Sequence, residues 1–266
     1  MMSYFDGLLE ARRQGLVSEH VHLGLFDADS GQTLASAQEA MSLHHLLHLA
    51  VTAGAIVVDV GCGFGGSLRL LDGRLDGLHL TGVNVDPRQI EVARGGVWRS
   101  AVDWQLCDAA AFSDGRAEWA DRILSLEAMF HFPDLAGFFA ASTRALRPGG
   151  RMVASTILFG TEADAASVAV ICAGFGPWPH PAMSLTGLCD LARAAGLAVG
   201  LVEDLAQRCR PGFDWMCPPC PDKLTDNPVI ELRRLFEAGT ASYPLLVLEL
   251  RDALKNATGT GGAEDR

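Results

Sequence analysis

A short apolar run that passes directly into a glycine-rich turn constrains this chain most: residues 55–66 read AIVVDVGCGFGG. The β-branched first half is typical of a strand that is buried on both faces, as in a parallel sheet. Glycines at positions 61, 63 and 65 let the backbone turn sharply and leave no Cβ to block a ligand. The apolar segment that follows from Ser67 predicts a helix that begins at this turn. Because a helix N-terminus exposes N–H groups, the stretch predicts a site for a nucleotide-like cofactor.

Predicted strands and helices alternate around this turn. Six further apolar runs are predicted as strands, at residues 78–85, 104–109, 122–126, 151–158, 197–204 and 243–250. Helices are predicted between several of them, at residues 87–94, 135–146 and 184–196. This alternation predicts an α/β fold with a doubly wound, mostly parallel, seven-stranded Rossmann-like sheet that binds ligands at the carboxyl ends of its strands.

The glycine spacing leaves more than one cofactor open. Gly61-x-Gly63-x-x-Gly66 also fits the dinucleotide fingerprint, and a glycine turn without any ligand is a further alternative. Asp59 lies two residues before the first glycine, at the end of the predicted strand. A carboxylate there can reach the amino group of an amino-acid-bearing cofactor, whereas a dinucleotide offers it no cationic group. Asp59 therefore favours an amino-acid-bearing cofactor.

With these features in place, the chain resembles the class I S-adenosylmethionine-dependent methyltransferases, most of all the bacterial small-molecule branch that modifies natural products. The matching motifs are VDVGCGFG at 58–65, TGVNVD at 81–86, CDA at 107–109, LEAMFHFPD at 126–134 and LRPGG at 146–150. The resemblance spans roughly residues 20–205 and implies S-adenosylmethionine as the cofactor. It implies these cofactor-binding residues: Asp59, Gly61, Cys62, Gly63, Gly65, Asn84, Val85, Asp108, Ala109 and Leu126. Asn84 departs from the family, because many relatives carry an acidic residue at this ribose position.

Three residues are candidates for the catalytic chemistry. His131 follows the fourth predicted strand, where the acceptor should lie, and an imidazole with a pKa of about 6.5 is suited to removing a proton from a hydroxyl or amine. His22 is the second choice, in a segment that the resemblance implies is a lid. Glu127 is expected to orient His131 or to hold the substrate. For His131 the alternative is a packed histidine that bonds a backbone carbonyl.

Apolar and aromatic residues predict the acceptor pocket. The candidates are Phe130, Phe175, Trp178, Met183 and Trp215, most of them in inserts at about 161–183 and 208–228. Long irregular segments in compact domains are often binding loops. We therefore expect a methyltransferase that acts on a hydrophobic small molecule in secondary metabolism, with O- or N-methylation favoured. The alternatives are a methyltransferase-fold protein that binds the cofactor without transferring methyl, as a cyclase or interaction module, and a nicotinamide oxidoreductase.

Metal binding is not expected. His44 and His48 are four residues apart on a predicted helix, which suits a metal, but no Glu or Cys lies nearby in the sequence, so a solvated polar face is favoured. Cys209, Cys217 and Cys220 leave a metal site, a disulfide and simple packing open.

The length of the chain, its net charge and the composition of its two ends limit the expected domain organisation and the expected partners. We expect an N-terminal helical lid at residues 1–52, a cofactor-binding domain at 53–252 and a disordered tail at 253–266. The net charge of −11 argues against binding through a phosphate backbone or to an anionic membrane. Without a secretion signal pattern, a cytoplasmic protein with reduced thiols is expected. The expected partner is a small-molecule acceptor, not nucleic acid or a membrane, and a homodimer stays open.

Overall fold

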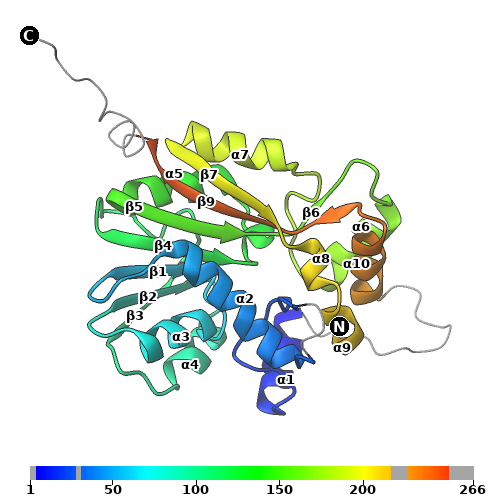
Figure 1. The fold of residues 1–266 in the computed structure, drawn as a ribbon, viewed down its shortest axis with the longest axis horizontal. Helices are drawn as coiled ribbons and strands as arrows, with labels where there is room; N and C mark the ends of the chain where they lie inside the picture. The colour runs from blue at the N-terminus through cyan, green and yellow to red at the C-terminus, as the bar shows by residue number, and fades with distance from the viewer. Residues whose placement is uncertain (1–3, 28–30, 217–226, 252–266) are drawn as a thin grey trace, which may run out of the picture.

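A seven-stranded sheet forms the centre of the protein (Figure 1). The structure, a computed structural model, describes residues 4–27, 31–216 and 227–251. The strand order is β3-β2-β1-β4-β5-β9-β7, and β9 is antiparallel to both of its neighbours while the other pairs are parallel. The strands are β1 (Ile56–Val60), β2 (His79–Asn84), β3 (Val102–Leu106), β4 (Ala120–Leu126), β5 (Leu146–Ser155), β7 (Leu197–Asp204) and β9 (Pro244–Leu250). The predicted mostly parallel, seven-stranded fold is confirmed.

Helices cover both faces of the sheet, as a doubly wound fold requires. The helices α2 (Leu34–Leu49), α3 (Gly66–Arg74) and α4 (Pro87–Arg94) lie on one side, and α2 crosses the front of the sheet in Figure 1. The other side carries α5 (Leu135–Ala145) and α7 (Leu185–Ala194). Met41 and Leu68 belong to the core on the first side, and Phe138 and Leu188 to the core on the second. The sheet is therefore buried on both faces, which explains its nearly continuous apolar strands.

The order of the strands reverses at β1, and this point positions the site. From β1 the chain moves outward through β2 to β3, and it then returns to place β4 on the other side of β1. The register pairs Asp59 with Gly82 on one side and with Leu124 on the other. Such a reversal leaves a crevice at the carboxyl ends of the two central strands, where open α/β sheets bind ligands.

The N-terminal segment divides into two parts. Helix α1 (Tyr4–Arg13) and residues 19–22 contribute to the wall of a cavity at this edge of the sheet. Helix α2 instead packs against α3 and the sheet, and its Met41 and Leu49 are fully buried. Within the described part of segment 1–52, α1 and residues 19–22 therefore line the cavity, and α2 does not.

The inserts are more regular than predicted. Residues 165–174 form α6 (Ala165–Gly174), which packs side by side with α10 (Pro228–Glu237) at the right-hand end of Figure 1. The sequence of α6 is apolar on almost every side, so no helical period marks it, and its N-cap Asp164 accepts from the Ser167 N–H. Two short strands, β6 (Leu158–Phe159) and β8 (Ala241–Ser242), pair antiparallel beside these helices.

The second insert is described only in part. It begins in α8 (Ala206–Cys209) and continues through α9 (Gly212–Met216), after which residues 217–226 lie outside the described residues, together with Cys217, Cys220 and the predicted tail. Cys209 is a buried free thiol. Within the described ranges, none of the helices has both the length and the apolar character needed to cross a membrane.

Candidate active site

One cavity opens at the carboxyl ends of β1, β2 and β4 and encloses about 1100 Å³, its open mouth included. Most of the residues that the sequence motifs singled out line it. They are Asp59, Gly61, Cys62, Gly63, Asn84, Val85, Asp108, Ala109, Leu126, Glu127, Phe130, His131 and His22. Gly65 is not part of the wall and instead caps the N-terminus of α3. The fold therefore brings four motifs that are far apart in the sequence to one cavity.

The glycine turn lies close against the neighbouring loop. Gly61 has a φ of 81°, and a Cβ at this position would lie 2.4 Å from the Cβ of Ala128. The Gly61 and Cys62 N–H groups donate to the Val83 carbonyl at 2.9 and 3.1 Å, which fixes the turn against β2. Helix α3 begins just beyond, and its N-cap residue, Gly65, has no side chain that could bond the first N–H groups. The turn therefore offers a narrow, Cβ-free wall with backbone donors, as an anionic or polar ligand group requires.

Asp59 is a buried carboxylate that faces this cavity. Its side chain is 3% exposed, and burial raises the pKa of Asp59 to about 7. Within the described part of the chain, its carboxylate has no hydrogen-bond partner. A buried, unpaired carboxylate is costly unless a cation pairs with it. The site therefore fits a ligand that carries an ammonium group, such as the amino-acid end of S-adenosylmethionine.

The ends of β2 and β3 supply polar groups that fit the rest of such a ligand. The Asn84 side chain donates to the side-chain Oε1 of Gln89 at 2.9 Å and accepts from the Asp86 N–H at 3.0 Å. Asp108 accepts from the Ala110 N–H at 2.8 Å through one oxygen. Both side chains keep acceptor capacity, since an amide or carboxylate oxygen has more than one lone pair. The apolar side chain of Val85 lies beside them and is 60% exposed, as a surface for a flat ring would be.

Glu127 joins the N-terminal segment to the sheet side of the cavity. Its backbone has a φ of 54°, and its Oε2 accepts from the Leu23 N–H and from the Tyr243 O–H, both at 2.8 Å. Burial raises the pKa of Glu127 to about 7. These two hydrogen bonds hold the carboxylate, which within the described residues makes no hydrogen bond to His131. A different group therefore orients His131.

The backbone carbonyl of Pro177 orients the His131 ring. The Nδ1 of His131 lies 2.6 Å from the Pro177 oxygen. Because a carbonyl only accepts, Nδ1 carries the hydrogen in the neutral ring, and Nε2 keeps its lone pair. Burial lowers the pKa of His131, which favours this neutral form. The rings of Phe5 and Phe130 lie 5.6 and 4.3 Å from the imidazole, so its surroundings are apolar.

His22 is bonded at both nitrogens. Nδ1 donates to the Leu23 carbonyl at 2.9 Å, and Nε2 lies 3.0 Å from the Ser42 hydroxyl, which must then donate to it. Burial lowers the pKa of His22 to about 3. The lone pair of this ring is engaged by Ser42, and this arrangement favours His131 over His22 as a base.

The five residues that were predicted to form the acceptor pocket occupy different positions. Phe130 lines the cavity, and Trp178 stacks on it with 4.2 Å between ring centroids. Trp178 and Met183 line a second, smaller cavity behind Phe130. Phe175 meets the Tyr4 ring edge-on, at 5.6 Å between centroids. Trp215 is 54% exposed on α9 and is part of neither cavity wall.

Several wall residues were not predicted individually. Tyr4, Phe5 and Leu8 of α1 face the acceptor end of the cavity, and Gln89 and His20 also line it. The apolar residues Phe5 and Leu8, within the expected helical lid at 1–52, were a signal for two of these. For Gln89 the signal would have been its position one turn into the helix after Asn84, where it supports that side chain.

Comparisons with known proteins agree with this geometry. The family model for the methyltransferase domain matches residues 58–154. The chain is 34% identical over 231 residues to the methyltransferase GfsG of Streptomyces halstedii, with 81% of each chain covered. It is 28% identical over 207 residues to the 27-O-demethylrifamycin SV methyltransferase of Amycolatopsis mediterranei, with 74% of each covered. A solved geranyl diphosphate methyltransferase in complex with SAM shares the fold, with a TM-score of 0.74 and 21% identity over 88% of this chain and 100% of that one.

Proposed function

Because this chain belongs to the class I S-adenosylmethionine-dependent methyltransferases, we propose that it methylates a hydroxyl or amino group of a hydrophobic small molecule, with a hydroxyl favoured. The observation that carries the proposal is His131, which presents an imidazole lone pair in an aromatic part of the cavity. A hydroxyl or amine acceptor must lose a proton, and a positioned base typically contributes about 10²–10⁴-fold to such a step. Two relatives support an oxygen acceptor, since one is a 27-O-demethylrifamycin SV methyltransferase and another an O-methyltransferase of Penicillium expansum.

The polar half of the cavity holds the methyl donor in this proposal. S-adenosylmethionine supplies an electrophilic methyl group on its sulfonium sulfur. Asp59 pairs with the donor's ammonium group, and the first N–H groups of α3 face the donor's carboxylate. Asn84 bonds the ribose, and the second oxygen of Asp108 accepts from the adenine amino group. Asp59, Asn84 and Asp108 are each held by a neighbouring residue or by burial. Binding of the donor therefore costs little further side-chain ordering.

The apolar half holds the acceptor and keeps water out. Tyr4 and Phe5 of α1 and Phe130 form its walls, and Trp178 supports Phe130 from behind. Alignment of two reacting groups is worth about 7–11 kcal/mol in well-oriented systems, so these walls contribute chiefly by position. The Nε2 of His131 takes the acceptor's proton, while the Pro177 carbonyl keeps the ring in the required tautomer. Residues 19–23 form the covering segment of this half, and Glu127 holds that segment by accepting from the Leu23 N–H.

Substitutions at His131 test the base. His131→Ala should leave S-adenosylmethionine affinity within about twofold and lower turnover by about 10²–10⁴-fold. His131→Gln is the matched variant, because its amide N–H can still donate to the Pro177 carbonyl but offers no basic nitrogen. It should be as slow as the alanine variant. Full activity in His131→Gln would show that the residue only positions the wall, and full activity in both would remove it from the chemistry.

The acceptor class needs a separate assay. Purified protein with S-adenosyl-[methyl-³H]methionine is offered matched phenols, anilines and macrolactone alcohols, and label is counted in the organic extract. Transfer to the hydroxyl compounds supports the proposal, and transfer to carbon alone contradicts it. Calorimetric binding of S-adenosylmethionine without transfer to any compound would favour the alternative in which the cofactor is bound but not used. Family membership leaves the nicotinamide oxidoreductase alternative without support.

A further inference from the structure

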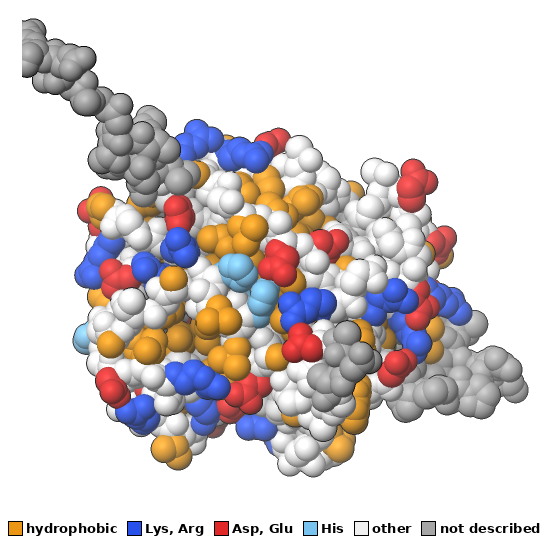
Figure 2. All heavy atoms as spheres, in the orientation of Figure 1, with side chains coloured by type: hydrophobic (Ala, Val, Ile, Leu, Met, Phe, Trp, Pro, Cys, Tyr) orange, Lys and Arg blue, Asp and Glu red, His pale blue; other side chains and the backbone are white. Residues whose placement is uncertain are grey.

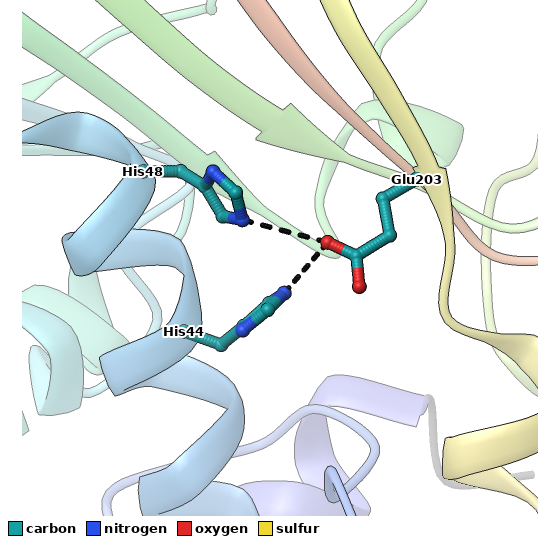
Figure 3. A group of neighbouring side chains, drawn as sticks. All are labelled: His44, His48 and Glu203. Atoms are coloured by element: carbon teal, nitrogen blue, oxygen red, sulfur yellow. Dashed lines mark hydrogen bonds and ion pairs between the residues drawn. The ribbon is translucent and has the colours of Figure 1, made fainter.

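Helix α2 carries polar side chains on two sides, and those of one side point away from the active-site cavity. Ser42 and His45 point inward, where the His45 Nε2 lies 2.8 Å from the Ser155 hydroxyl. His44 and His48 lie four residues apart on the outward side and are only partly buried. The sequence offered them no nearby third ligand. The fold does, because β7 brings Glu203 beside both rings (Figure 3).

The three side chains converge on one point. The Glu203 Oε2 lies 2.8 Å from the His44 Nε2 and 3.4 Å from the His48 Nε2. All three ligand atoms lie within 4.8 Å of one another, and Figure 3 shows both rings turned toward the carboxylate from the same side of the helix. Zn²⁺ binds such atoms at about 2.0–2.2 Å, so two ligands of a tetrahedral site are about 3.3–3.5 Å apart. The observed spacing therefore needs only small side-chain rotations to admit an ion.

The exposure of the cluster also suits a metal site. The side chains of His44, His48 and Glu203 are 20%, 29% and 33% exposed, so their geometry is held by neighbours while an ion can enter from solvent. In Figure 2 histidine side chains reach the surface near the middle of this face, beside an acidic side chain. A three-residue site that is open on one side leaves a coordination position for water.

We propose that His44, His48 and Glu203 bind a divalent transition-metal ion of the Zn²⁺ class, which ties helix α2 to strand β7. Two imidazoles and one carboxylate are a ligand set that Zn²⁺ uses, and imidazole disfavours Mg²⁺ and Ca²⁺. None of the three residues lines the active-site cavity. The site is therefore independent of the proposed methyl transfer, and its binding can be measured without turnover.

The predicted consequence of the ion is a fixed position for α2. The same helix holds Ser42, which bonds His22, and His45, which bonds Ser155, so it supports the wall of the cavity from behind. An ion bound to the folded chain but not to the unfolded one stabilises the fold in proportion to ln(1 + [metal]/Kd). The thermal midpoint should therefore rise with Zn²⁺ concentration.

Zinc calorimetry on the full-length chain tests the site. The sample for this experiment is prepared without an affinity tag and with the substitutions Cys217→Ser and Cys220→Ser, because those two thiols could bind Zn²⁺ elsewhere. After treatment with a chelator, one Zn²⁺ per chain should bind. His48→Gln and Glu203→Gln should each weaken binding by at least about tenfold, since even the loss of an outer-shell partner costs about 10–100-fold. His79→Ala, a change at an exposed histidine on β2, is the matched control and should bind as the parent does.

Two further readouts make the result decisive. Co²⁺ in place of Zn²⁺ should give the visible absorption of a tetrahedral nitrogen and oxygen site, which His48→Gln should abolish. The zinc-dependent rise in thermal midpoint should also disappear in Glu203→Gln. Equal Zn²⁺ binding in the parent, His48→Gln and Glu203→Gln would overturn the proposal. Absence of binding to the parent would show that the cluster is only an ion pair between α2 and β7.

Discussion

Asp59→Asn should separate the stability of the fold from its affinity for S-adenosylmethionine. The wild-type carboxyl is buried, and its pKa is raised from 3.8 to about 7 because burial disfavours the charge. In the free protein the group is therefore about half ionised at pH 7 and about one-tenth ionised at pH 6. Only the ionised form can pair with the donor's ammonium group, so binding must release a proton at the lower pH.

The pH dependence of binding follows with a definite sign. The ammonium group lowers the pKa of Asp59 in the complex, so full affinity is present above the raised pKa of about 7 and is lost as pH falls through it. From pH 7 to pH 6 the ionised fraction falls about fivefold, and the Kd for S-adenosylmethionine should rise by the same factor. Asp59→Asn should bind weakly at both values and show no such slope.

Stability should change in the opposite direction. An unfolded Asp59 ionises near 3.8, whereas the folded group keeps its proton to about 7, so the free protein loses stability as pH rises between these values. Three pKa units correspond to about 4 kcal/mol, which is an upper bound because the amide of the variant also needs hydrogen bonds. Asp59→Asn should therefore unfold at higher urea concentration than the wild type at pH 8.

Isothermal titration calorimetry in buffers of different ionisation enthalpy measures both the affinity and the released proton. Glu127→Gln is the matched control, because the pKa of Glu127 is also raised to about 7 in the same cavity. The slope should persist in Glu127→Gln. A slope that disappears in Glu127→Gln and survives in Asp59→Asn would refute the reasoning, since Glu127 would then be the titrating partner.

Two further substitutions test other contacts of the cavity. Tyr243→Phe removes the O–H that donates to Glu127, so a buried carboxylate loses a partner and the free energy of unfolding should fall by about 1–3 kcal/mol in urea titrations. Tyr4→Phe should change this free energy little, because the Tyr4 hydroxyl makes no hydrogen bond within the described residues. Gly61→Ala places a Cβ 2.4 Å from that of Ala128 at a positive φ, so it should lose S-adenosylmethionine binding and destabilise by about 1–3 kcal/mol or more. Adding Ala128→Gly to Gly61→Ala should restore part of the affinity, and no recovery would mean that the φ strain alone is limiting.

The elements around the donor could be predicted because their signals are local in sequence. The strand and turn at 55–66 contain both Asp59 and the glycines that shape the wall, so one stretch encodes a strand, its end and its ligand contacts. Asn84 and Asp108 follow their strands directly, and the parallel topology alone brings these strand ends to one edge. Long-range packing was not needed for this half of the site.

The acceptor side could not be predicted in the same way, because its partners are distant in sequence. The Pro177 carbonyl that orients His131 is 46 residues away, and Tyr243, which bonds Glu127, is 116 residues away. Neither pairing leaves a local pattern. The segment of helix α6 was predicted as irregular for a related reason, since a sequence that is apolar on almost every side shows no clear helical period, even though α10 covers the helix. Glu203 beside His44 belongs to the same class of long-range contact.

The two buried carboxylates of the cavity have the same raised pKa for the same reason, but their partners give them different roles. Asp59 has no hydrogen bond in the described structure, so the cost of its charge falls only when a cationic ligand arrives. Glu127 already accepts from Leu23 and Tyr243, and of these two bonds only the one to Leu23 depends on the covering segment. Loss of the Leu23 bond alone would cost about 1.5–3 kcal/mol, while Tyr243 keeps the Glu127 side chain in place. Glu127 therefore suits a group that fastens the cover, and Asp59 suits the group that recognises the donor.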